Sequence, residues 1–82
     1  MKTFTFRTII EPDDNGTFHG FAPALSGCHT WGKTLEETRE NLRDAMKVYL
    51  SSLAEDGEPI PKDTGYEMLE TVTFQEPVRA YA

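Results

Sequence analysis

The chain has 82 residues, a formal net charge of −6 and a sequence pI near 4.7. A chain of this length encloses one compact core, so we expect a single domain over residues 1–82. The excess of acidic residues argues against a general binder of nucleic acid or anionic membranes, because such binders gather Lys and Arg on one surface; it favours a basic partner.

Cys28 is the only cysteine, which excludes an intramolecular disulfide and a zinc site built from several thiolates. The N-terminus alternates polar and apolar residues and so lacks the continuous apolar segment of a signal peptide. No stretch approaches the roughly 18 apolar residues that a membrane-spanning helix needs. We therefore expect a cytoplasmic protein.

The first half of the chain has the pattern of a β-hairpin. Residues 2–11 carry Phe4, Phe6 and Ile10 on one side of a period-two alternation, which predicts a half-buried strand. Residues 12–16 then supply proline, aspartate, asparagine and glycine, which favour a chain reversal. A second strand is predicted over residues 17–22, where Pro23 ends it because proline donates no ladder hydrogen bond.

A short third strand over residues 28–32 leads into a long helix. Thr34 and Glu37 form a capping-box pattern, which predicts that the helix starts at Thr34. Apolar side chains then recur at steps of three and four residues or their sums, and this predicts one stripe packed on the sheet; they are Leu35, Leu42, Ala45, Met46, Tyr49 and Leu53. Asp56 and Gly57 mark the end, giving a helix of about 20 residues, or about 30 Å.

A fourth strand is predicted over residues 69–74, where β-prone residues run until Pro77. The predicted order is therefore β-β-β-α-β, an α+β fold in which one antiparallel sheet carries one long helix on a face.

Two blocks carry a resemblance to a known family. Phe21-Ala-Pro-Ala-Leu-Ser-Gly-Cys28 and Gly32-Lys-Thr-Leu-Glu-Glu37 resemble, in residues and spacing, the corresponding blocks of HicB-like antitoxin domains. The resemblance extends over most of residues 1–62. It implies a partial ribonuclease H-like fold and a partner of the HicA type, a small basic mRNA-cleaving toxin whose active site the antitoxin covers.

The sequence departs from the family pattern in two places. Thr38 stands where the family usually has a small alanine. The chain ends at Ala82 with no appended DNA-binding domain of the kind that many members carry, so we expect no direct binding of nucleic acid and leave transcriptional autoregulation open.

The acidic residues have structural roles beside any functional one. Asp13 and Asp14 lie in the predicted turn, where aspartate hydrogen-bonds nearby backbone, and Glu36 and Glu37 lie in the first helical turn, where acids favour the helix dipole. As contacts to a basic partner we nevertheless select an acidic set with one aromatic anchor: Asp13, Asp14, Trp31, Glu36, Glu37 and Glu40.

The remaining reactive side chains do not form a catalytic or metal-binding set. Cys28 and His29 are neighbours on a predicted strand and so point to opposite faces, and we assign Cys28 to the core. His19 and His29 share the outward side with Phe21 and Trp31, which predicts an exposed patch of aromatic and imidazole rings. Two histidines alone fall short of a metal site, so we expect no metal and no cofactor.

The leading hypothesis is a non-catalytic HicB-family antitoxin that acts as a homo-dimer or higher homo-oligomer and neutralises a HicA-like toxin. The alternative is an orphan HicB-like module that binds a small ligand or another protein and has no toxin partner, because a fold does not fix a function. A residual metal-dependent nuclease ranks below both, since the sequence lacks a converging set of carboxylates.

Overall fold

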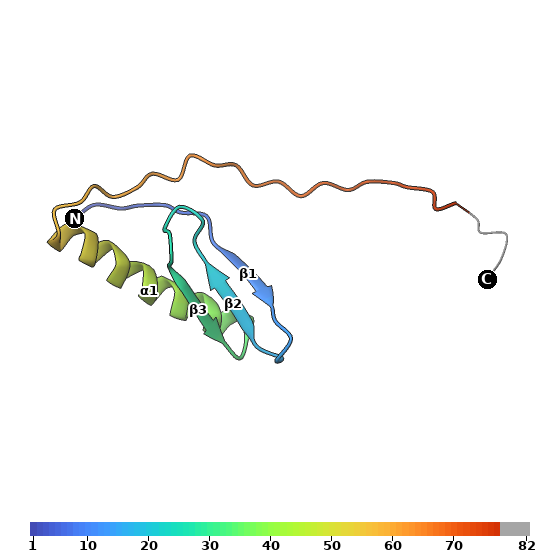
Figure 1. The fold of residues 1–82 in the computed structure, drawn as a ribbon, viewed down its shortest axis with the longest axis horizontal. Coiled ribbons are helices and arrows are strands. Elements are labelled where there is room, and N and C mark those ends of the chain that lie inside the picture. Colours follow the sequence, from blue (N-terminus) through green and yellow to red (C-terminus); the bar gives the residue numbers. More distant parts are fainter. Residues whose placement is uncertain (78–82) are drawn as a thin grey trace.

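The computed structural model describes residues 1–77 and confirms the α+β class, with one antiparallel sheet and one long helix. Strands β1 (Ile9–Pro12), β2 (Phe18–Phe21) and β3 (His29–Gly32) pair in the order β1-β2-β3. Helix α1 (Leu35–Glu55) covers one face of this sheet (Figure 1). The resemblance to part of a ribonuclease H fold stays a prediction.

Strand β1 is shorter than the period-two pattern predicts, because its partner is short. Ile9 pairs with Phe21 and Pro12 with Phe18, so residues 2–8 extend past the end of β2 and have no backbone partner there. Pro23, two residues after β2, prevents that strand from continuing beside them. The predicted inward side of this segment is nevertheless right, since Phe6 packs against the core.

The capping box at the start of α1 forms largely as predicted. Thr34 is the N-cap, and its Oγ1 accepts a hydrogen bond of 3.0 Å from the backbone N–H of Glu37. Glu37 Oε1 in turn accepts from the backbone N–H of Lys33 at 3.3 Å, one residue earlier than in the usual box. These bonds satisfy donors that the first helical turn would otherwise leave free.

The core is small and lies between α1 and the connection that joins β2 to β3. It is made of Ala22, Leu25, Cys28 and Leu42, with Phe6, Ala45, Met46, Tyr49 and Leu50 packed around them. Cys28 is 5% exposed, as predicted, and burial raises the pKa of its thiol. Leu35, predicted to lie in the helical stripe, is instead 58% exposed, because the first turn of α1 lies beyond the sheet-facing residues Thr38 and Leu42.

Thr38 is the residue by which α1 approaches the sheet most closely, and its side chain is fully buried. Its Oγ1 donates to the backbone carbonyl of Thr34 at 2.7 Å, so the buried hydroxyl is satisfied. Opposite it, a Cβ at Gly32 would lie 2.7 Å from Thr38 N, and one at Gly20 would lie 3.0 Å from Thr38 Cγ2. Two glycines therefore provide the space that Thr38 occupies.

Helix α1 ends in a Schellman turn at Gly57, whose φ of 69° favours glycine. The backbone N–H of Gly57 donates to Ala54 and that of Glu58 to Leu53, at 3.1 and 2.9 Å. Residues 58–66 then run back beside the N-terminal segment (Figure 1).

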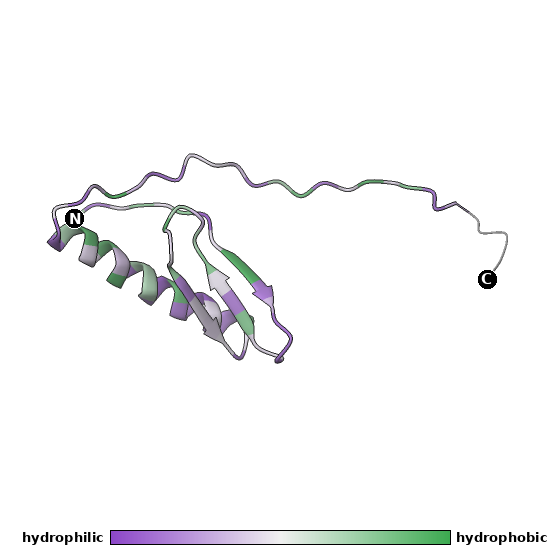
Figure 2. Ribbon diagram, in the orientation of Figure 1, coloured by the Kyte–Doolittle hydropathy of each residue, from purple (hydrophilic) through white to green (hydrophobic). Residues whose placement is uncertain are grey.

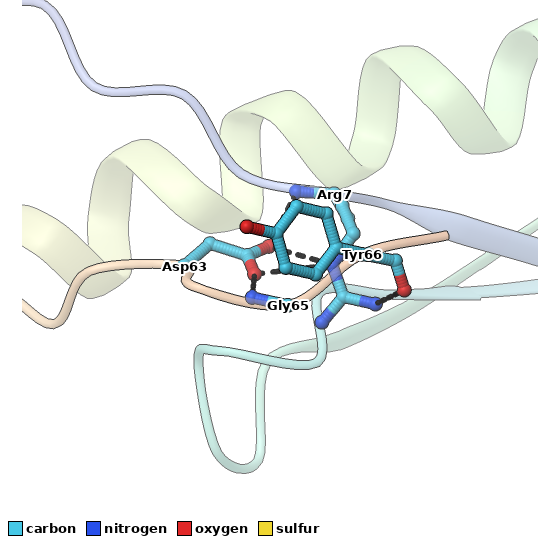
Figure 3. A network of polar contacts seen from close by, with 4 residues as sticks. All are labelled: Arg7, Asp63, Gly65 and Tyr66. Atoms are coloured by element: carbon cyan, nitrogen blue, oxygen red, sulfur yellow. Dashed lines mark hydrogen bonds and ion pairs between the residues drawn. The ribbon is translucent and has the colours of Figure 1, made fainter. Parts of the chain in front are cut away.

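An ion pair fixes this returning chain to the residue that precedes β1. Arg7 donates to Asp63 from its backbone N–H at 2.7 Å and from Nε at 3.0 Å, and its guanidinium also donates to the carbonyl of Tyr66 at 3.4 Å (Figure 3). The hydrogen bond from the backbone N–H of Arg7 is the main reason that the pKa of Asp63 lies below its usual value. Gly65 N–H donates to Asp63 Oδ1 as well. We call this network the Arg7 clamp.

The fourth strand predicted over residues 69–74 does not form. Beyond the Arg7 clamp, residues 67–77 leave the folded body as an extended, fully exposed segment, in which apolar and polar residues alternate (Figure 2). A β-prone sequence becomes a strand only where another backbone can share its hydrogen bonds, and no edge of this sheet lies beside the segment. Within the described residues, α1 is too polar to cross a membrane.

Candidate partner-binding surface

The sheet face opposite α1 is not covered by any other element within residues 1–77 (Figure 1). The strand register aligns Glu11 with His19 and Trp31, and aligns Ile9 with Phe21 and His29. Since side chains alternate across a strand and Gly20 and Gly32 face Thr38, these six side chains all lie on the other side. We call this surface the open face; its residues are Ile9, Glu11, His19, Phe21, His29 and Trp31.

Four rings of the open face form one cluster of stacked and tilted pairs. The ring centroids of His19 lie 4.9 Å from Trp31, 5.0 Å from His29 and 5.5 Å from Phe21. His29 and Trp31 are exposed, Trp31 by 57%, while the other two rings are half-buried. The predicted patch of aromatic and imidazole rings is thus confirmed. Cross-strand neighbours on one sheet face touch, which explains why residues from two different strands form one cluster.

The two histidines make a direct hydrogen bond, with 2.8 Å between His19 Nε2 and His29 Nδ1. One of these nitrogens carries the proton and the other accepts it. A metal site would need at least one further ligand, and within residues 1–77 no three His, Cys, Asp or Glu side chains gather closely enough to hold an ion. The pair therefore orients the two rings within the cluster.

Asp13 closes the turn between β1 and β2. Its Oδ1 accepts hydrogen bonds from the backbone N–H groups of Asn15 and Thr17, at 3.0 and 3.2 Å, and both its oxygens lie within 2.8 Å of Thr17 Oγ1. The hydroxyl of Thr17 is the main reason that the pKa of Asp13 lies below its usual value. Asp14, by contrast, is exposed and makes no side-chain hydrogen bond within the described residues, so its charge is directed to solvent.

The three helical acids selected from sequence have different surroundings. Glu37 belongs to the capping network, whereas Glu36 is exposed one residue earlier. Glu40 lies on the outer surface of α1 in a shallow depression with Arg43, Asp44 and Lys47. Trp31 lies on the open face, so the structure does not bring Glu40 and Trp31 onto one continuous surface.

The turn with Asp14 and the start of α1 with Glu36 do lie at the same end of the sheet (Figure 1). The chain enters this end from β1 and returns to it from β3. Trp31 is the second-last residue of β3 and therefore lies close to this end. The aromatic cluster is thus bordered by acidic side chains at one end of the open face.

Sequence reasoning missed two contacts that shape this surface. Asn41 Nδ2 donates to the backbone carbonyl of Trp31 at 2.9 Å and so ties the outer edge of β3 to the helix. The Arg7 clamp joins residues 56 positions apart. A charged residue within the apolar alternation of residues 2–11 was a signal for Arg7, but nothing local indicates its partner.

Comparisons with known proteins agree with one another. A family model described as "HicB_like antitoxin of bacterial toxin-antitoxin system" matches residues 6–81. A UPF0150 protein of Synechocystis sp. is 35% identical over 62 residues, which cover 76% of this chain and 78% of that protein. A UPF0150 protein of Thermoplasma acidophilum is 38% identical over 63 residues, covering 77% and 91% of the two chains.

One solved structure shares the arrangement of strands and helix. It is the crystal structure of the N-terminal domain of the Burkholderia pseudomallei antitoxin HicB, with a TM-score of 0.62 and 29% sequence identity. The match covers 67% of this chain and 65% of that one, just under two thirds of its length.

Proposed function

The chain belongs to the HicB-like antitoxin family of bacterial toxin-antitoxin systems, and from this premise we propose that it binds and neutralises a basic, RNA-cleaving toxin of the HicA type by covering the toxin's active site. In this proposal the chain acts in the cytoplasm, as a homo-dimer, by binding alone and without chemistry of its own.

The observation that carries the proposal is the exposed ring cluster of the open face. Surface aromatic residues gathered in one patch are typical of protein interfaces, where Trp is among the residues whose truncation weakens binding most. Trp31 is 57% exposed although its ring contacts that of His19 in a tilted arrangement. This contact holds the indole in one orientation before a partner arrives, which lowers the conformational entropy that binding would cost.

The acidic end of the open face supports a basic partner. Asp14 and Glu36 are exposed, and Glu11 lies on the open face itself. Opposite charges steer association and make its rate fall with added salt, whereas the desolvated centre of an interface decides how slowly the complex separates. We therefore assign steering to these acids and anchoring to Trp31. Asp13 and Glu37 contribute charge at this end, but hydrogen bonds within the chain already engage their carboxylates.

The proposal is tested by expressing the chain together with the small basic protein encoded beside its gene. We expect the two proteins to copurify and RNA cleavage by the neighbour to be suppressed. Trp31→Ala should weaken the complex by about 2 kcal/mol or more, which is roughly 30-fold in Kd. Titration calorimetry or surface plasmon resonance measures this change.

Leu69→Ala is the matched control, because Leu69 is also a large exposed apolar residue, at 99%, but lies in the extended segment that follows the Arg7 clamp and not on the open face. Its Kd should equal that of the unsubstituted chain. Equal losses in the two variants, or none in Trp31→Ala, would refute the anchor. A chain that has no such neighbour and suppresses no cleavage would instead be an orphan binding module.

A further inference from the structure

The exposed segment of residues 66–77 has the side-chain pattern of a strand with one apolar side. Tyr66, Met68, Val72 and Phe74 share one parity, which only Glu70 interrupts within this span. Each of these four apolar residues is at least 74% exposed. The opposite parity is mostly polar, with Thr71 and Thr73 near its centre. An alternating segment that buries nothing within its own chain indicates a surface elsewhere that receives it. We call this segment the tail.

Of the two edges of the sheet, that of β1 is the less obstructed for a further strand. The edge of β3 is tied to the helix, because Asn41 Nδ2 occupies the carbonyl of Trp31. The other edge belongs to β1, and no side chain within residues 1–77 hydrogen-bonds to the backbone of Ile9–Pro12. An edge with unpaired N–H and C=O groups accepts another strand readily.

An apolar groove with a basic rim lies along the N-terminal segment that leads into β1, and no residue of Ile9–Pro12 lines it. Helix α1 packs on β2 and β3 more than on β1, which leaves the side chains below the N-terminal segment uncovered. The groove holds a volume of about 520 Å³ between that segment and α1, and its apolar lining includes Phe4, Phe6, Met46 and Leu50. Its charged lining residues are Lys2, Arg43 and Lys47, and none of its lining residues is acidic.

The charges of the tail match this rim. The tail carries Glu67, Glu70 and Glu76 and no basic residue. Within the described residues the structure has one ion pair, Arg7 with Asp63, so no rim cation is in an ion pair, although Arg43 and Lys47 share a depression with Glu40 and Asp44. The tail thus offers a backbone for the unpaired edge of β1, apolar side chains for the groove and carboxylates for the basic rim.

We propose that the tail of one copy of this chain adds as a strand along the N-terminal segment and β1 of a second copy, with its apolar side chains in the groove beside that N-terminal segment, and that the exchange is reciprocal. A second copy is favoured because the Arg7 clamp fixes Tyr66 just before β1 and the tail then runs straight away from its own sheet (Figures 1 and 3). In a reciprocal exchange between two identical chains the same contact forms twice, so both tails and both β1 edges are covered. This inference deepens the proposed homo-dimer and needs no toxin.

The first test measures the mass of the full-length protein in solution by size-exclusion chromatography with light scattering. We expect twice the chain mass of 9.3 kDa. Val72→Glu with Phe74→Glu should convert the dimer to a monomer, because two carboxylates would enter the groove. The matched control, Thr71→Glu with Thr73→Glu, adds the same charge at the same place on the opposite parity and should remain dimeric. Far-UV circular dichroism checks that α1 stays folded in each variant.

The second test separates exchange between copies from packing of the tail on its own sheet. Hydrogen exchange followed by mass spectrometry should show tail amides that are protected at high protein concentration and lose protection on dilution. Protection that is independent of concentration in a monomer would mean that the tail packs on its own chain and would overturn the proposal. A monomeric unsubstituted chain with an unprotected tail, or a dimer that survives Val72→Glu with Phe74→Glu, would overturn it too. None of these results depends on toxin binding, so the two proposals fail separately.

Discussion

The two faces of the sheet arise from the same three short strands but carry different kinds of side chain. On the covered face, Gly20 and Gly32 leave space that Thr38 of the helix fills. On the open face, the rings of half-buried His19 and exposed Trp31 contact each other, with their centroids 4.9 Å apart. Small residues on one parity allow the helix to approach, and large rings on the other parity form a surface for a partner.

The difference separates stability from binding within a single sheet. Contacts of α1 with the covered face and with the β2–β3 connection contribute most of the apolar burial, because the fully buried large side chains within residues 1–77 are Leu42 and Thr38 of α1 and Leu25 of that connection. The rings of the open face are held by their neighbours but are not enclosed. Substitutions on the two faces should therefore have different effects, and three predictions test this, in order of expected effect on stability.

Leu42→Ala should produce the largest loss of stability. Leu42 is 1% exposed at the centre of the core, and removing a buried leucine side chain typically costs about 2–5 kcal/mol, through lost transfer free energy and the cavity left behind. Urea unfolding at fixed protein concentration measures the loss. Val48→Ala on the exposed side of the same helix should change stability by less than about 0.5 kcal/mol. If the two losses were similar, the covered face would not be the core.

Gly32→Ala should produce the next largest loss of stability, about 1–3 kcal/mol, because the new Cβ would lie 2.7 Å from Thr38 N and 2.9 Å from its Cα. Gly20→Ala should cost less, since its Cβ would meet only side chains, the nearest being Thr38 Cγ2 at 3.0 Å. Adding Thr38→Ala should relieve Gly20→Ala more than Gly32→Ala, because it removes the Thr38 side-chain atoms beside both glycines but leaves Thr38 N and Cα in contact with the new Cβ at Gly32. A double-mutant cycle by urea unfolding measures both couplings, and equal relief in the two pairs would contradict this account.

Trp31→Ala should have the smallest effect on stability, less than about 1 kcal/mol, which is the usual value of one cross-strand pair. The same variant is expected to lose most of its affinity for the toxin, so its two measurements together sharpen the comparison. Thermal unfolding of the unbound protein gives the first. A loss of stability as large as that of Leu42→Ala would show that the open face is part of the core and not a binding surface.

Much of the fold was predictable because its signals are local. The turn at residues 12–16, the cap at Thr34 and the end of α1 at Gly57 each depend on the chemistry of a few adjacent residues. The ring cluster was also predictable, since strand parity alone places His19 and Trp31 on the side away from Cys28. The buried position of Thr38 was not predictable, because nothing near Thr38 in the sequence indicates that two glycines lie opposite it.

The sequence by itself determined the class of the fold, the order of its first four elements and the sorting of side chains onto two sheet faces, because hydrophobic period and capping chemistry act over a few residues. Only the tertiary structure decided where the strands end, which helical residue reaches the sheet, and that Arg7 holds the returning chain through Asp63. It also decided that residues 69–74 remain unpaired. These features depend on backbone groups far apart in the chain, whose hydrogen bonds form only once the sheet, the helix and the clamp have set the distances between them.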